Sequence, residues 1–220
     1  MTKRILLVGG SGLIGHSLLS GLLNQNVQVL LPLRDLERWR HENSTLSSHP
    51  NLTLTSYDKL WTQTPELDAF FCALGTTQAK SGKAGLMKVD HDLVIKSAEF
   101  ALHAGAKIAS VVSAIGANPK SVFFYNRVKG QMEKSLTALD FETIHIWQPS
   151  LLMGERPEKR FLEEFAGKFM HLSLWGNAQA LPGKTVAKAM LQAFVQGTQA
   201  GVQIFNVADI KRFAAQSLKY

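Results

Sequence analysis

Short apolar segments alternate along the chain with longer segments whose apolar residues recur every three or four positions. The short segments are rich in β-branched and aromatic residues, which is typical of strands that are buried on both faces of a parallel sheet. Six strands are expected: ILLVG from Ile5, VQVLLPL from Val27, LTLTS from Leu52, DAFFCAL from Asp68, IASVVSA from Ile108 and TIHIWQP from Thr143. The alternation predicts βαβ units and therefore an α/β fold, a doubly wound parallel sheet of the Rossmann type.

The intervening segments predict helices that cover this sheet. Apolar residues fall at helical spacing in two places, and each set would form a stripe that faces the strands. The sets are Ile14, Leu18, Leu19 and Leu22, and then Leu86, Val89, Leu93, Val94 and Ala101. Residues 38–50 are instead rich in Ser, His and Asn, so we expect a loop or an irregular helix end there.

The length of 220 residues, 45% of them hydrophobic, favours one compact domain over residues 1–220. The pattern is less regular beyond Gly154, and residues 155–220 are expected to form a small C-terminal helical appendage on the substrate side of that domain. Helices are expected near 158–169, 186–195 and 210–217, with a short strand at VQIFNV. The side chains that could line an apolar substrate pocket are Phe161, Phe165, Phe169, Leu172 and Trp175.

The composition limits which cellular compartment and which partners are expected for this protein. Cys72 is the one cysteine, so no intramolecular disulfide forms and a reducing compartment is favoured. No apolar run approaches the roughly 20 residues of a membrane helix, and a glycine turn interrupts the apolar run after Arg4 where a secretory signal would continue. We therefore expect a soluble, cytoplasmic protein that has no membrane partner and is a monomer or a homodimer.

Neither nucleic-acid binding nor a metal site is expected. The formal charge is +7, but the basic residues are scattered and are not interleaved with aromatic residues, so a generally basic surface is the simpler interpretation. The seven histidines show no metal-ligand spacing, and there is no cysteine cluster.

The segment GGSGLIG, residues 9–15, follows the first predicted strand and opens a helix. Its glycines at positions 9, 12 and 15 allow a tight turn and the close approach of the backbone to a pyrophosphate. The free N–H groups at the helix start favour an anion, and Ser11 adds a hydroxyl. The alternative is a glycine-rich turn without a ligand, but the order of the strands favours a dinucleotide.

The residue that follows the second strand predicts which dinucleotide binds. Sites specific for NAD carry an acidic residue there that accepts hydrogen bonds from the ribose, whereas this chain has Arg34. A guanidinium can pair with a 2′-phosphate, so NADP(H) is the expected cofactor. The alternative is that Arg34 is a solvated surface residue and Asp35 takes the acidic role.

Polar residues follow the other strands too, and all of them would meet at the carboxyl edge of the sheet, where open α/β proteins bind ligands. We expect Asp58 near the adenine and Gly75 close to the cofactor. The polar or flexible positions are Tyr57, Asp58, Gly75, Thr76, Thr77, Ser113, Gly116 and residues 149–154.

Tyr125 and Lys129 are four residues apart in FYNRVKGQMEKSL, so they lie on one face of a predicted helix, with Val128, Met132 and Leu136 continuing a buried stripe. An ammonium on that side needs a partner, which the ribose-phosphate region of a cofactor would supply. Its charge would lower the pKa of Tyr125, which could then act as the acid or base in hydride transfer. Ser113 could hydrogen-bond the same substrate oxygen. The alternative is an aromatic core residue beside a snorkelling lysine.

The segments GGSGLIG, CALGTT, VVSAIGA, FYNRVKGQMEKSL and WQPSLLMGER together resemble the atypical short-chain dehydrogenase/reductases, most closely the branch related to the Tat-interacting protein oxidoreductase. The resemblance covers nearly the whole chain. It implies an NADP(H)-binding Rossmann domain with Tyr125 and Lys129 as the active-site pair, Ser113 beside them, and residues 149–152 against the nicotinamide. The chain departs from that branch at Gln148, where an arginine is common, and it has no obvious asparagine for the proton relay of the classical enzymes.

The expected function is hydride transfer to or from a small carbonyl, alcohol or quinone substrate. The alternatives are a regulatory protein that senses NAD(P)H without turnover, a nucleotide-sugar epimerase or dehydratase, and a flavin or quinone reductase that does not use Tyr125. The expected catalytic residues are Ser113, Tyr125 and Lys129. The expected cofactor-binding residues are Gly9, Ser11, Gly12, Leu13, Ile14, Gly15, Arg34, Tyr57, Asp58, Leu74, Gly75, Thr76, Tyr125, Lys129, Pro149, Leu151 and Leu152.

Overall fold

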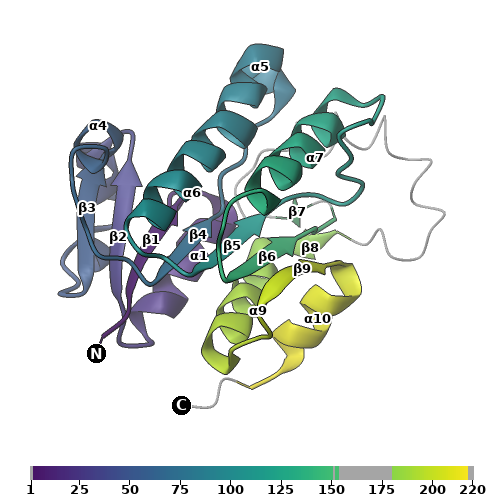
Figure 1. Ribbon diagram of the computed structural model, residues 1–220. Helices are drawn as coiled ribbons and strands as arrows, with labels where there is room; N and C mark the ends of the chain where they lie inside the picture. Colours follow the sequence, from purple (N-terminus) through teal and green to yellow (C-terminus); the bar gives the residue numbers. More distant parts are fainter. Residues whose placement is uncertain (1, 151, 154–179, 218–220) are drawn as a thin grey trace.

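Seven parallel strands form one sheet in the order β3-β2-β1-β4-β5-β6-β9 (Figure 1). The computed structural model describes residues 2–150, 152–153 and 180–217. The strands are β1 (Arg4–Val8), β2 (Gln28–Leu33), β3 (Leu52–Ser56), β4 (Ala69–Cys72), β5 (Ile108–Val112), β6 (Thr143–Trp147) and β9 (Gly201–Phe205). The strand order reverses between β1 and β4, as in a Rossmann fold. The predicted doubly wound sheet and its six strands are confirmed.

Helices cover both faces of this sheet (Figure 1). One face carries α1 (Leu13–Leu23), α2 (Leu36–Glu42), α3 (Ser44–Ser47), α9 (Gly183–Gln196) and α10 (Val207–Ala215). The other carries α4 (Tyr57–Leu60), α6 (Leu93–His103) and α7 (Phe124–Thr137). α5 (Gln78–Met87) and η1 (Lys88–Asp92) precede α6 and pack against α7. Within the described ranges, no helix has both the length and the apolar character needed to cross a bilayer.

The inner strands of the sheet are apolar on both faces, because alternate residues of these strands enter different cores. In β1, Ile5 and Leu7 pack under α1 and α9, whereas Leu6 and Val8 pack under α6 and α7. All four side chains are fully buried. This double burial explains why a strand such as β1 is a continuous apolar run in the sequence.

Residues 38–50 contain two helices, so the expectation of a loop or an irregular helix end was wrong. Asp35 precedes α2, and its carboxylate accepts a hydrogen bond from the backbone N–H of Arg38 over 3.0 Å. Trp39 anchors α2 in the core with 4% of its surface exposed. The helix is therefore specified by its cap and by one buried aromatic residue, and not by a repeated apolar stripe.

The C-terminal described residues 180–217 contribute directly to the Rossmann sheet. The strand expected at VQIFNV is β9, which pairs with β6 at the edge of the sheet, and the helices expected at 186–195 and 210–217 correspond to α9 and α10. A Cβ on Gly21 of α1 would lie 2.8 Å from a methyl carbon of Leu191, so α9 packs closely on α1. β7 (Leu152–Met153) and β8 (Leu181–Pro182) form a separate two-stranded parallel sheet. The helix expected at 158–169 and the apolar pocket residues lie outside the described residues.

His145 is a histidine buried in the core of β6, with 2% of its surface exposed. Its Nε2 lies 2.6 Å from the hydroxyl of Thr198, and its ring meets those of Trp147 and Phe205 edge to face. Burial lowers the pKa of His145 to about 4. The imidazole is therefore neutral in the folded protein at neutral pH.

This burial predicts acid sensitivity. An unfolded histidine has a pKa of about 6.5, so the unfolded state binds the proton first as the pH falls. The contribution of His145 is complete above pH 6.5 and is lost between about pH 6.5 and 4, by up to about 3 kcal/mol. Urea unfolding at a series of pH values should show this slope, and His145→Gln should have a shallower slope over the same range. Equal slopes in the two proteins would contradict the assignment.

Candidate active site

The turn between β1 and α1 fits closely against the end of β4. Gly9 has a φ of +88°, and a Cβ there would lie 2.6 Å from the carbonyl carbon of Ala73. A Cβ on Gly15 would lie 2.1 Å from the carbonyl oxygen of Gly9, and Gly12 N–H closes the turn on the same oxygen over 3.0 Å. The backbone therefore folds into a cradle without side chains, and Gly12 starts α1 without a side-chain cap. This cradle fits a pyrophosphate, for which the α1 N–H groups are suitable donors.

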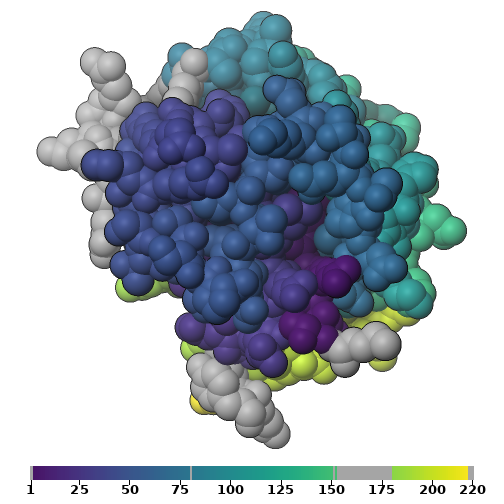
Figure 2. Space-filling view, turned by 90° about the vertical axis from the view of Figure 1, so that its left-hand side faces the viewer, coloured from purple at the N-terminus to yellow at the C-terminus, as the bar shows by residue number. Residues whose placement is uncertain are grey.

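Arg34 and Tyr57 lie at the carboxyl ends of the neighbouring strands β2 and β3. Figure 2 shows this side of the molecule, where the purple and blue N-terminal segments form most of the surface. Arg34 is exposed and forms no ion pair within the described residues. Burial raises the pKa of Tyr57 well above its usual range, although the Arg34 charge acts in the opposite direction. Asp35 is occupied as the cap of α2, whereas Asp58 is exposed on α4.

Lys129 of α7 has a protein partner that the sequence interpretation did not include. Its Nζ lies 2.8 Å from Asp90 Oδ1, and at most 2% of either side chain is exposed. The other carboxylate oxygen of Asp90 accepts a hydrogen bond from the backbone N–H of Thr76 over 2.8 Å. The expectation that a cofactor supplies the partner of this ammonium was therefore wrong. Asp90 joins Lys129 to the segment after β4, at which Gly75 and Thr76 are expected to meet the cofactor.

This pair changes the proton chemistry of Tyr125. Burial alone would favour a neutral Lys129, but the charge of Asp90 and the proximity of Tyr125 outweigh it, so the pKa of Lys129 lies above its ordinary value. The pKa of Tyr125 is also raised, because burial disfavours the phenolate, and Asp90 adds to this effect. Lys129 does favour the phenolate, as expected, but it does not determine the net direction. The expected lowering of the Tyr125 pKa is not found.

Asp90 reaches this position through a π-helical turn. The helical stripe predicted from Leu86 to Ala101 is divided into α5, η1 and α6, and Asp90 lies inside η1. A π turn contains one more residue than an α turn, so it shifts the phase of the stripe and turns the carboxylate into the interior. The sequence signal was an acidic residue within an apolar stripe, KVDHDLV, whose partner is distant in the chain.

Ser113 faces α7 from the end of β5, and its side chain is buried with 3% exposed. Its hydroxyl donates a hydrogen bond to Glu133 Oε1, which also accepts one from Gln148 Nε2 over 2.9 Å. Glu133 was not among the predicted site residues, although it follows Lys129 by four positions on the same helix face. The structure thus groups Ser113 with Glu133 and Gln148, and it groups Tyr125 with Lys129 and Asp90.

The loop after β5 is held in place by Asn126, a second residue that sequence reasoning missed. Its amide Nδ2 donates to the carbonyl oxygens of Ile115 and Gly116 over 3.2 and 2.8 Å. Gly116 has a φ of +74°, and a Cβ there would lie 2.7 Å from the same nitrogen. Because Asn126 follows Tyr125 directly, the start of α7 and this loop are fixed together. Ile115 N–H also donates to the carbonyl oxygen of Pro149, which places Pro149 beside this loop.

The remaining predicted cofactor residues lie near these groups or outside the described residues. Ser11 and Leu13 are exposed at the turn, Ile14 is buried in α1, and Leu74 is half-buried after β4. Leu152 belongs to β7, and Leu151 lies outside the described residues.

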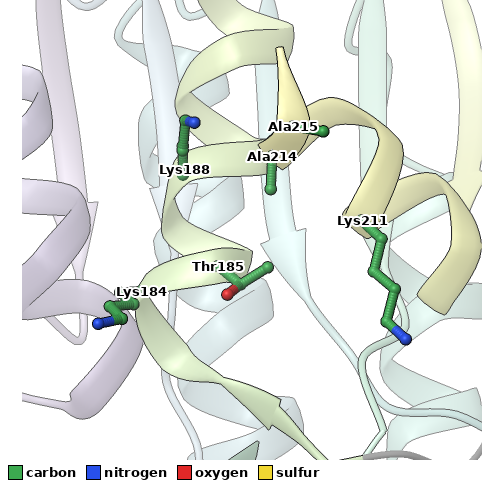
Figure 3. A pocket seen from close by; sticks show the side chains of 6 residues that line it. All are labelled: Lys184, Thr185, Lys188, Lys211, Ala214 and Ala215. Atoms are coloured by element: carbon green, nitrogen blue, oxygen red, sulfur yellow. The ribbon is translucent and has the colours of Figure 1, made fainter. Parts of the chain in front are cut away.

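A separate groove of about 460 Å³ lies between α9 and α10 and is lined by Lys184, Thr185, Lys188, Lys211, Ala214 and Ala215 (Figure 3). The ammonium groups of Lys184 and Lys211 point to opposite sides, so they do not converge on one anion. None of the predicted site residues lines this groove. The candidate active site therefore remains at the carboxyl edge of the sheet.

Comparison with known proteins decides the family. The chain is 34% identical over 198 residues to the protein named HTATIP2 from Rattus norvegicus, covering 88% of this chain and 81% of the relative. It belongs to the atypical short-chain dehydrogenase/reductases, in the HTATIP2-like branch of NAD(P)-binding Rossmann-fold proteins. It is also 32% identical over 216 residues to a protein of Emericella nidulans named fmp52, mitochondrial, with 90% and 91% of the two chains covered. No protein-family model matches the chain.

Solved structures share the fold at low sequence identity. MoeE5 in complex with UDP-glucuronic acid and NAD has a TM-score of 0.69 at 14% identity, over 93% of this chain and 76% of that one. An oxidoreductase of the short-chain dehydrogenase/reductase family from Burkholderia thailandensis has a TM-score of 0.67 at 15% identity, over 93% and 91%. ElxO with NADP bound has a TM-score of 0.60 at 16% identity, over 93% and 97%. The neighbours therefore include both NAD and NADP complexes.

The names of the relatives correct one expectation. Several fungal relatives, from Emericella nidulans, Aspergillus clavatus and Lodderomyces elongisporus, are named as mitochondrial proteins. The expectation of a cytoplasmic location was therefore wrong. Its main support, a single unpaired cysteine, indicates a reducing environment but does not distinguish one reducing compartment from another.

The buried ion pair yields a prediction about stability. Asp90→Asn leaves the ammonium of Lys129 without a counter-charge, so the free energy of unfolding should fall by about 3–5 kcal/mol. Replacing both partners, as Asp90→Asn with Lys129→Met, should recover most of that loss because no buried charge remains. Urea unfolding measures both effects. Asp92→Asn, at an exposed carboxylate two residues away, is the matched control and should change little. An equal loss in Asp92→Asn would contradict this prediction.

Proposed function

We propose that the protein is an NADP(H)-dependent oxidoreductase that transfers hydride to or from a small carbonyl, alcohol or quinone substrate. The observation that carries this proposal is the chain of contacts from Lys129 through Asp90 to the backbone of Thr76. These contacts connect Lys129, and with it the proposed acid or base Tyr125, to the end of β4. A dinucleotide is expected to bind at that strand end. Membership of an NAD(P)-binding family supports the same reaction class.

Different residues at the carboxyl edge of the sheet would bind the cofactor and transfer the proton. Gly9, Gly12 and Gly15 would admit the pyrophosphate to the start of α1, and Arg34 would pair with a 2′-phosphate. When bound, the nicotinamide supplies or accepts the hydride. Tyr125 would give its phenolic proton to a carbonyl oxygen, or take the proton of an alcohol in the reverse direction, and Lys129 would stabilise the phenolate.

The preference for NADP(H) is supported by the contrasting states of Arg34 and Asp35. Asp35 is engaged in capping α2, which leaves it a poor acceptor for ribose hydroxyls, whereas Arg34 is exposed and unpaired among the described residues. A guanidinium at this position would form charge-assisted hydrogen bonds with a 2′-phosphate.

The cofactor preference is tested by fluorescence titration with NADPH and NADH. The wild-type protein should bind NADPH more tightly, and Arg34→Ala should weaken NADPH binding about tenfold while it leaves NADH nearly unchanged. Arg38→Ala is the matched control, because Arg38 is exposed nearby but already paired with Glu42. Tighter binding of NADH by the wild-type protein would contradict the assignment.

The role of Tyr125 is tested by NADPH oxidation with a panel of aldehydes, ketones and quinones. Tyr125→Phe should lower turnover about 100-fold or more, the usual contribution of a positioned proton donor, while NADPH affinity stays within about twofold. Turnover that persists in Tyr125→Phe would contradict proton transfer by this residue.

A second candidate function is a regulatory protein that binds NAD(P)H without turnover. It is favoured by the raised pKa of Tyr125 and by the ion pair in which the Asp90 carboxylate balances the charge of the Lys129 ammonium group. Both features disfavour a phenolate at Tyr125. The same experiment separates the two functions. Tight NADPH binding without turnover on any member of the panel would support the sensor.

A further inference from the structure

Glu133 is a carboxylate to which the proposed mechanism of cofactor binding and proton transfer assigns no role. On its Oε1 it accepts hydrogen bonds from Ser113 Oγ and from Gln148 Nε2. Ser113 and Gln148 follow the adjacent strands β5 and β6, and Glu133 reaches them from α7, one turn beyond Lys129. The three side chains thus form a polar cluster between the sheet and the helix that carries Tyr125.

The negative charge of Glu133 has no cationic partner among the described residues. Every ion pair found within these residues involves other carboxylates, and Lys129, one helical turn before Glu133, is paired with Asp90. Both of its observed donors converge on Oε1. A half-buried carboxylate in this situation depends on its hydrogen-bond donors, so it should hold the Ser113 proton firmly.

The cluster is not needed to hold the strands together. Ser113 N–H already donates to the carbonyl oxygen of Trp147 over 2.7 Å, and Gln148 N–H donates to that of Phe205 over 2.8 Å. The backbone therefore fixes both residues without Glu133. The effect of the carboxylate is to orient the O–H bond of Ser113 toward Glu133.

That direction matters because a serine hydroxyl has one proton and two lone pairs. While the proton is donated to Glu133, Ser113 can only accept a hydrogen bond from a ligand. A carbonyl oxygen also offers only lone pairs, so it gains nothing from Ser113 unless the bond to Glu133 is broken. An alcohol hydroxyl can donate its proton to Ser113 and leave that bond intact.

We propose that Glu133 is a positioning residue that fixes Ser113 as a hydrogen-bond acceptor, so that the site binds an alcohol more tightly than the matching carbonyl compound. The inference rests on the proposed function, which assigns Ser113 to the substrate oxygen. The substrate class it names is an alcohol, or a compound that carries a hydroxyl group at the position that meets Ser113.

The test measures binding in complexes that cannot react. 1-Phenylethanol is added to the protein saturated with NADPH, and acetophenone to the protein saturated with NADP⁺. The first pair lacks a hydride acceptor and the second lacks a hydride donor, so neither turns over. Dissociation constants from ligand-observed NMR then report hydrogen bonding at Ser113 without catalysis. The wild-type protein should bind the alcohol about tenfold more tightly than the ketone, the value of one charge-supported hydrogen bond.

Two variants and one control identify the cause of the preference. Glu133→Gln keeps the size but removes the charge and replaces one acceptor oxygen by an N–H donor group, which can donate to Ser113 and free its proton for a ligand. The ratio of the two dissociation constants should then fall close to one. Ser113→Ala should remove the preference as well, and adding Glu133→Gln to it should have no further effect. Glu99→Gln, at an exposed glutamate on α6, should keep the wild-type ratio. A merely structural role for Glu133 would weaken both ligands equally and preserve the ratio.

The outcomes separate this inference from the function on which it rests. NADPH that saturates the wild-type protein, together with equal binding of alcohol and ketone, contradicts the role of Glu133 but leaves the oxidoreductase proposal intact. A preference that survives Glu133→Gln, or that survives Ser113→Ala if the first variant fails to bind NADPH, also overturns it. Absence of NADPH binding by the wild-type protein overturns both.

Discussion

An ammonium group with almost no access to water is stable only beside a negative charge, and this requirement organises the centre of the molecule. Lys129 on α7 meets Asp90 on η1, and Asp90 in turn accepts the backbone N–H of Thr76 after β4. One carboxylate therefore fixes a helix, a π turn and a strand end relative to one another. The desolvation of both ions is offset only because this geometry is satisfied as a whole.

The charges of Lys129 and Asp90 also affect the pKa of Tyr125. Burial disfavours the phenolate and the charge of Asp90 adds to this effect, so the pKa of Tyr125 is raised although the Lys129 charge acts in the opposite direction. One turn further along the same helix face, the carboxylate of Glu133 accepts hydrogen bonds from Ser113 and Gln148. Among the described residues, the site thus contains one carboxylate that is paired with a lysine and one that has no cationic partner.

The glycine turn depends on distant parts of the chain as well as on its own sequence. Gly9 lies against the backbone at Ala73, and a Cβ on Gly183 would lie 2.5 Å from Leu13 Cγ. The turn is therefore enclosed by the end of β4 on one side and by the start of α9 on the other. Such support makes the cradle rigid before a ligand arrives, which lowers the entropic cost of binding.

The sequence by itself determined the sheet, its first six strands, the helix stripes and the glycine turn, because burial on both faces produces local apolar patterns that can be read along the chain. It also brought Tyr125 and Lys129 onto one helix face by their spacing. Only the tertiary structure showed that Asp90 partners Lys129 and that Glu133 holds the Ser113 hydroxyl, because these contacts join residues 39 and 20 positions apart. The π turn that directs Asp90 inward leaves no periodic signal of its own. The direction of the Tyr125 pKa followed from these contacts, since burial and the charges of distant residues decide it, and local spacing does not.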